Sequence, residues 1–554
     1  MQAQFGTQPS LFQSTLSCLA VLFRLERRIL ALIFSYSLAI GLFSLIVPLT
    51  VQELVNTFAF AIQPITILTL AGIMVTGLLF VGAFRALQFY AVEMIERRVF
   101  ARVALGMAQQ LPRLQFLGFQ PRYANYFMET VFMQRALSVL LVDLIKVIVG
   151  GAVGMTILVF YHPYFLLYNI LLLAGFSVVV FLMAHGGLKS TIDMSDAKYS
   201  TQHWLQEVSD NLLHFKATDS QALVMGRTDD LVHTYIERRQ TRFAILIRQY
   251  LASVGWQAIA HSGLLATAGW LLFNGQLTLG QLVAAEVVVF GLLLNFDAVI
   301  KRMGHVYYFL TSLNELNLFF SLPKDDVSAT LSIPLPDPTT HGIRMTCKDL
   351  AVTNPGQASI FERFNLELTP GEKIGIYART TAAKTALARV LAGLETPTGG
   401  VIRYNSVDLR HLDIHTINRC RGFMIDSHLT LFDGTIEDNI VMGRTYIPYS
   451  NIQWALGFTE LDEDIDALPQ GLKTHIQALG TSSASTHITQ ILLARTILSR
   501  PPILIFDGLM HHIPPAMRET LLRRLCSKDE PWSVVFVSND PRLTPHVDRH
   551  IILD

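Results

Sequence analysis

The chain has 554 residues, of which 51% are hydrophobic and only 16% are charged. Together with a mean hydropathy of +0.40, this indicates a membrane protein with an appended soluble part rather than a single globular domain. Lys and Arg number 43 and so do Asp and Glu, which argues against nucleic acid as a partner. The four cysteines are scattered without metal-binding spacing and are expected to be reduced.

Apolar, charge-free runs predict six membrane-spanning helices, because one span takes roughly 20 residues. Basic residues gather before the first span, in alternate connectors and after the sixth span, while the other connectors contain no Lys or Arg. Both termini are therefore expected in the cytoplasm, with the protein in the inner cell membrane. The predicted spans lie at about 29–51, 64–84, 147–160 with the preceding turns, 163–185, 250–273 and 279–300.

The two long cytoplasmic connectors have helical apolar spacing. VEMIERRVFARVALGMAQQL (92–111) and TQHWLQEVSDNLLHFKATDS (201–220) contain few helix breakers. The spanning helices are therefore predicted to continue into the cytoplasm and turn back there.

Charged residues inside or near the spans are candidates for a translocation path. Glu286, in LVAAEVVVF, should face the bundle interior or a water-filled cavity. It either lines the path or makes an interhelical hydrogen bond, and His261 is expected to be a hydrogen-bonded packing residue. Asp143 and Lys146, three residues apart, favour a local ion pair over a substrate site. Arg85 is expected to extend its charge to the membrane surface.

The composition changes after about residue 320. Residues 321–342 are rich in Pro, Ser and Asp and are predicted to be a linker. The predicted organisation is an N-terminal cytoplasmic segment (1–23), a six-span domain (24–320), this linker and a soluble domain (343–554). Alternating strands and helices in the last part predict an α/β domain with a mostly parallel sheet. Its strands include residues 373–377, 502–507, 533–539 and 550–554.

GEKIGIYARTTAAKTALARVLAG (371–393) has the outline of a phosphate-binding loop between a strand and a helix. LFDGTIEDNI (431–440), LLARTILSRPPILIFD (492–507) and VDRHIILD (547–554) follow in order. With the six spans, this ordered set resembles a half-transporter of the ABC exporter family. RVALGMAQQLPRL and LTLGQLVAAE are similar to the type I protein and peptide secretion group. The resemblance implies an α-helical transmembrane domain fused to a P-loop NTPase-like domain that binds ATP and Mg²⁺ and works as a dimer.

The phosphate loop departs from the family pattern. Aligned on Lys384, the family's glycines become Ala378, Thr381 and Ala383. Each Cβ disfavours positive φ and hinders close backbone approach to a phosphate. Lys384 and Thr385 are retained, so these five positions, together with Asp507, form a residual nucleotide site with weak expected affinity.

The resemblance places other catalytic positions on unsuitable side chains. Asp507 ends the Walker B strand and, with Thr385, is the candidate Mg²⁺ ligand. Gly508 replaces the glutamate that polarises the attacking water, and glycine cannot act as a base. Asn539 replaces the switch histidine and does not exchange protons near neutral pH. No catalytic residue is therefore assigned.

The remaining family positions also differ. The D-loop aspartate corresponds to Pro514, the Q-loop glutamine to Asp426 or Ser427, and the adenine-stacking tyrosine to Asn354. The signature motif is replaced by Ser483, Ala484, Ser485, Thr486 and His487.

Three hypotheses follow. The first is an exporter-like subunit in a homodimer or heterodimer whose nucleotide domain is a pseudo-ATPase, working with an ATPase-competent paralogue and a membrane-fusion adaptor. The second is a slow but active exporter of peptide, protein or lipophilic cargo. The third is a non-transporting regulatory or scaffold membrane protein.

Overall fold

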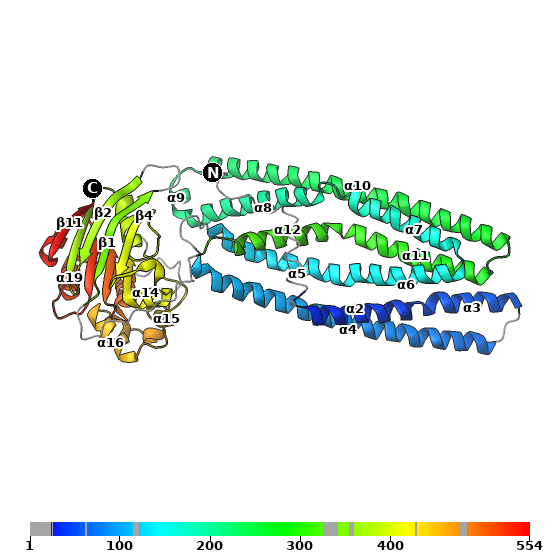
Figure 1. Cartoon of the computed structure of the whole chain (residues 1–554), viewed down its shortest axis with the longest axis horizontal. Coiled ribbons are helices and arrows are strands. Elements are labelled where there is room, and N and C mark those ends of the chain that lie inside the picture. Colours follow the sequence, from blue (N-terminus) through cyan, green and yellow to red (C-terminus); the bar gives the residue numbers. More distant parts are fainter. Residues whose placement is uncertain are drawn as a thin grey trace. The chain divides into compact units, whose positions relative to one another are not determined.

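The computed structural model describes residues 24, 26–60, 64–114, 121–324, 342–353, 359–426, 429–476 and 485–553. The chain divides into two compact units, shown in Figure 1. One contains the helices from α2 to α12, and the other contains all the strands and the helices from α13 to α19. Most of the predicted linker, together with Asn354, Ser427, Ser483 and Ala484, lies outside the described residues.

The first unit consists of long helices that run side by side (Figure 1). α2 packs against α4 and α6, and α11 packs against α3, α6 and α10. The elements are α2 (Arg27–Ser44), α3 (Ile46–Phe60), α4 (Pro64–Gln110), η1 (Leu111–Arg113), η2 (Pro121–Met128), α5 (Glu129–Val139), η3 (Leu140–Leu144), α6 (Ile145–Tyr161), α7 (Tyr164–Ser177), η4 (Val178–Leu182), α8 (Gly187–Asp210), α9 (Leu212–Ala217), α10 (Gln221–Phe273), α11 (Leu279–Lys301) and α12 (Met303–Phe320).

Five helical stretches among the described residues are long and apolar enough to cross a membrane. The sixth predicted span, 250–273, is helical as the last part of α10 but is not among these five. Gln257, His261 and Thr267 lower the apolar character of that segment. The five stretches are Arg27–Thr57, Pro64–Arg113, Asn125–Tyr161, Tyr164–Asp210 and Leu279–Lys301.

Large exposed apolar side chains lie on several helices of this unit, α10 included. Phe273, Phe160 and Phe181 are 90%, 83% and 78% exposed, as expected of side chains that meet lipid rather than water. The helical character predicted for the two connectors is confirmed. Residues 92–111 lie within α4 except for the last, and most of residues 201–220 belong to the end of α8 or to α9.

The second unit is built on a five-stranded parallel sheet in the order β11-β3-β10-β9-β6. Every residue of the central strands β9 and β10 is buried. This confirms the predicted parallel sheet and the four strands assigned to it. The strands are β3 (Lys373–Ala378), β6 (Arg421–Ile425), β9 (Ile503–Asp507), β10 (Ser533–Val537) and β11 (Arg549–Leu553).

An antiparallel sheet of four strands, β2-β1-β4-β5, completes the α/β fold. Helix α13 contacts both this sheet, through β2, and the parallel sheet. The strands are β1 (Met345–Thr353), β2 (Ser359–Leu368), β4 (Gly399–Tyr404) and β5 (Val407–Asp408), with a separate pair β7 (Gly434–Thr435) and β8 (His475–Ile476). The helices are α13 (Thr381–Leu391), α14 (Ile414–Cys420), α15 (Ile436–Val441), α16 (Tyr449–Phe458), α17 (Asp462–Asp466), α18 (Ser485–Ile497) and α19 (Pro515–Leu525).

Candidate functional site

The carboxyl ends of β3 and β9 meet at one edge of the parallel sheet, where ligands bind in folds of this kind. Lys384 Nζ, from α13, lies 3.1 Å from Asp507 Oδ1 at the end of β9. Asp507 is buried, and neither of its carboxylate oxygens accepts a hydrogen bond from the described residues. A buried carboxylate with free lone pairs next to a lysine is a suitable partner for a cation or for a phosphate-bound metal.

The start of α13 differs from a phosphate loop that curls around its ligand. The helix begins at Thr381, and the backbone from 378 to 385 contains no positive φ. Thr380 caps the helix: its Oγ1 accepts from the Ala383 N–H at 3.1 Å, and its carbonyl accepts from the Lys384 N–H at 3.1 Å. The Ala383 and Lys384 amides therefore already have partners within the chain, which leaves fewer N–H groups at this helix start for a phosphate.

Asn539 binds the backbone of Ala378 through two hydrogen bonds. The Ala378 N–H donates to Asn539 Oδ1 at 2.9 Å, and Asn539 Nδ2 donates to the Ala378 carbonyl at 2.6 Å. The side chain at the switch position therefore fixes the end of β3.

Gly508 has φ +119, a conformation that L side chains rarely adopt. A Cβ at this position would lie 2.4 Å from the Cβ of Asp426. The backbone here accommodates glycine and has no room for the glutamate that the family pattern would place at 508.

His511 is a residue that the sequence analysis missed. Its backbone N–H donates to Asp426 Oδ2 at 3.0 Å, and its ring nitrogens lie 4.0 Å and 3.7 Å from carboxylate oxygens of Asp426 and Asp540. Its place shortly after the Walker B aspartate was the available signal.

The described part of the signature segment makes contacts within its own domain. Ser485 begins α18, Thr486 Oγ1 donates to the His512 carbonyl at 3.0 Å, and His487 Nε2 lies 3.2 Å from Asp464 Oδ2. Pro514 precedes the first turn of α19.

The structure tests two predictions about charged residues in the helical unit. The predicted pair between Asp143 and Lys146 is wrong, because Asp143 pairs with Arg302, the residue that directly follows α11. Glu286 on α11 lies 3.4 Å from His261 Nδ1 on α10, which is the interhelical alternative. Its role in a translocation path stays a prediction.

A bundle of long apolar helices followed by an α/β domain with a lysine–aspartate pair at its strand ends is the architecture of a transmembrane domain fused to a nucleotide-binding domain. The fold is that of an ABC exporter. Residues 361–510 match the family model described as ABC transporter. An ABC ATPase domain implies ATP and Mg²⁺ as ligands. That Lys384, Thr385 and Asp507 hold them stays a prediction.

One solved structure shares the fold, and curated proteins share part of the sequence. A bacterial Atm1-family ABC exporter with ATP bound has a TM-score of 0.81 at 17% identity and covers 96% of this chain and 94% of its own, which shows the fold. The mycobactin import ATP-binding/permease protein IrtB of Mycolicibacterium thermoresistibile is 24% identical over 55% of this chain and 52% of its own.

The mesentericin-Y105 transport/processing ATP-binding protein MesD of Leuconostoc mesenteroides is 22% identical over 93% of this chain and 71% of its own. The chain spans about half the length of the first curated relatives that it matches.

Proposed function

We propose that the chain is one half of a dimeric, ATP-dependent transporter of the exporter type, with its nucleotide domain in the cytoplasm. The observation that carries this proposal is the Lys384–Asp507 pair at the strand ends of an ABC-type domain that follows a bundle of membrane-length helices. The lysine would attract the phosphates and the aspartate would hold Mg²⁺. A bound Mg²⁺ would offset phosphate charge during transfer.

The names of the relatives support transport without agreeing on cargo or direction. One refers to mycobactin import and another to mesentericin transport and processing. A peptide, protein or lipophilic cargo fits the apolar membrane domain. Dimerisation with an identical or a second half-transporter, and work with a membrane-fusion adaptor in the inner membrane, belong to the same proposal.

A second candidate is a transporter subunit whose own nucleotide domain does not hydrolyse ATP. Three features favour it. Thr380 caps the first amides of α13, Asn539 is hydrogen-bonded to the backbone of Ala378, and there is no room for a side chain at Gly508. Any hydrolysis at this site would require a base other than residue 508, and His511, beside Asp426 and Asp540, is the candidate.

Steady-state ATPase of the purified full chain separates the two candidates, with Lys384→Ala as the control. Lysine-dependent turnover above roughly 0.1 s⁻¹, against about 1–10³ s⁻¹ for typical enzymes, supports the ATP-driven exporter. Turnover below this value in the wild type, unchanged by Lys384→Ala, supports the pseudo-ATPase. Loss of turnover in His511→Ala would assign the proton acceptor.

A further inference from the structure

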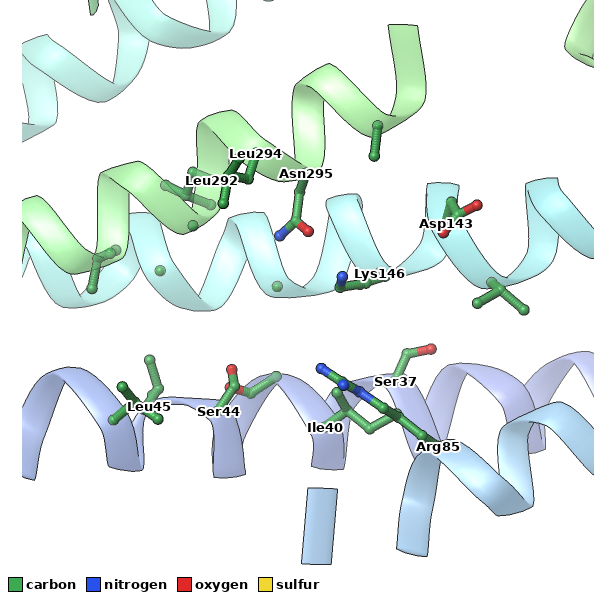
Figure 2. A pocket seen from close by; sticks show the side chains of 18 of the residues that line it. Ser37, Ile40, Ser44, Leu45, Arg85, Asp143, Lys146, Leu292, Leu294 and Asn295 are labelled. Carbon is green, nitrogen blue, oxygen red and sulfur yellow. The ribbon is translucent and has the colours of Figure 1, made fainter. Parts of the chain in front are cut away.

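The helical unit contains a cavity of about 910 Å³ between α2, α4, α6 and α11 (Figure 2). This volume is in the range of pockets that hold organic ligands. All of its lining residues belong to the helical unit, so the cavity does not depend on how the two units are arranged.

Two basic side chains reach this cavity from different helices. Arg85 comes from α4 and Lys146 from α6, and Asn295 of α11 lies near them (Figure 2). Gln88 and Ser37 also line it and are hydrogen-bonded to each other at 3.0 Å. The polar groups are therefore gathered in one region of a mostly apolar membrane domain.

The two cations have no acidic partner among the described residues. Asp143 also lines the cavity, but its carboxylate pairs with Arg302. Neither Arg85 nor Lys146 takes part in an ion pair within the described ranges. Two like charges that face one cavity inside a membrane domain repel each other, and a bound anion would offset that repulsion.

The rest of the wall suits an apolar body. Ile40, Leu45 and Leu292 line it. A Cβ at Gly150 or Gly291 would meet no atom within 4 Å, so these glycines border open space and leave room for a ligand.

We propose that this cavity binds an amphipathic anion, with its carboxylate or phosphate group between Arg85 and Lys146 and its apolar part along α2 and α11. The inference deepens the proposed transport function by naming the chemical class of ligand. A charge-assisted hydrogen bond from each cation would fix the head group, and burial of the apolar part would supply the rest of the affinity.

The test uses the full chain in phosphatidylcholine nanodiscs without ATP. The probe is 11-(dansylamino)undecanoic acid, and its methyl ester is the neutral match. We expect saturable fluorescence enhancement with the acid and binding about tenfold weaker or more with the ester, since the ester cannot accept charge-assisted hydrogen bonds through a carboxylate.

Arg85→Gln and Lys146→Gln should each weaken binding of the acid about tenfold and leave binding of the ester unchanged. The charge-retaining pair Arg85→Lys and Lys146→Arg should keep most of the affinity, which separates loss of charge from loss of folding. Arg97→Gln is the matched control, because Arg97 is also on α4 but pairs with Glu93 at 2.8 Å and does not line the cavity.

Equal binding of acid and ester, or equal affinity in the wild type and both Gln variants, would overturn the proposal. Replacing part of the phosphatidylcholine by phosphatidylglycerol identifies the source of the anion. If phosphatidylglycerol competes with the acid in the wild type but not in the double Gln variant, the site binds a lipid head group. If phosphatidylglycerol does not compete with the acid, the site binds a free amphipathic anion. Because the binding measurement needs no ATP, a failure of ATP-driven transport leaves its outcome unaffected.

Discussion

A Cβ on Gly508 would lie 2.4 Å from the Cβ of Asp426, closer than two carbon atoms of different residues can approach. The carboxylate of Asp426 is fixed in this place, because it accepts the His511 backbone N–H and its own backbone N–H donates to the Asp507 carbonyl at 2.9 Å. The loop after β9 is therefore built around a residue without a side chain, and introducing the family's glutamate requires more than one substitution.

We predict that Gly508→Glu alone does not raise ATP turnover and lowers the free energy of unfolding by about 2 kcal/mol or more, from strain at positive φ and the clash with Asp426. Thermal unfolding and steady-state ATPase measure both effects. Asp426→Gly combined with Gly508→Glu removes the clash and should recover part of the lost stability. A fully stable, faster Gly508→Glu single variant would contradict the geometry.

Removing the amine of Lys384 leaves the buried Asp507 carboxylate without a cation. Lys384→Ala is expected to lower the free energy of unfolding by about 2–3 kcal/mol, at the low end for a broken buried pair because Lys384 is partly exposed. We expect MgATP to raise the melting temperature of the wild type and to have no such effect on Lys384→Ala. Lys473→Ala, at an exposed lysine, should change neither quantity.

Periodicity and apolar length predicted the helices and the parallel sheet, because burial against a sheet or against lipid determines those patterns locally. The contacts of the candidate site could not be predicted in the same way. Both the hydrogen bonds of Asn539 to Ala378 and the ion pair of Asp143 with Arg302 join segments that are distant in the sequence. Residue spacing along one helix indicated Lys146 as the partner of Asp143 instead. His511 was missed because an isolated histidine in a loop has no periodic signal.

The Thr380 cap on α13 contributes to local stability whatever the domain does with nucleotide. Thr380→Ala removes the acceptor for the Ala383 N–H and is expected to cost about 1 kcal/mol of unfolding free energy. Thr380→Ser keeps the hydroxyl and should stay close to the wild type. Equal stability of the Ala and Ser variants in denaturant titrations would show that the cap contributes nothing.

The stability of the helical unit should depend on pH through Glu315 of α12. Burial, with Glu129 and Asp196 nearby, raises the pKa of this carboxyl to about 7. Glu129 is itself held by Lys198 Nζ and Tyr199 Oη, both at 2.6 Å. Since the folded state keeps its proton at a pH where the unfolded state has lost it, stability falls as pH rises through about 4.5 to 7.

Glu315→Gln should remove this part of the pH dependence and raise stability at pH 8 relative to the wild type, by up to about 3 kcal/mol. Melting temperatures between pH 5 and pH 8 provide the measurement. Glu362→Gln, at an exposed glutamate of β2, is the matched control and should follow the wild type. Parallel curves for the wild type and Glu315→Gln would contradict the assignment.

Helix α10 is a single helix from Gln221 to Phe273, with 53 residues. At 1.5 Å per residue it is about 80 Å long, more than twice the roughly 30 Å hydrocarbon core of a bilayer. Each end lies about 40 Å from the midpoint, so a tilt of about 5° about the midpoint would displace each end by about 3–4 Å. Because α10 is one uninterrupted helix, a tilt of its membrane-spanning end displaces its other end as well, without a hinge between them.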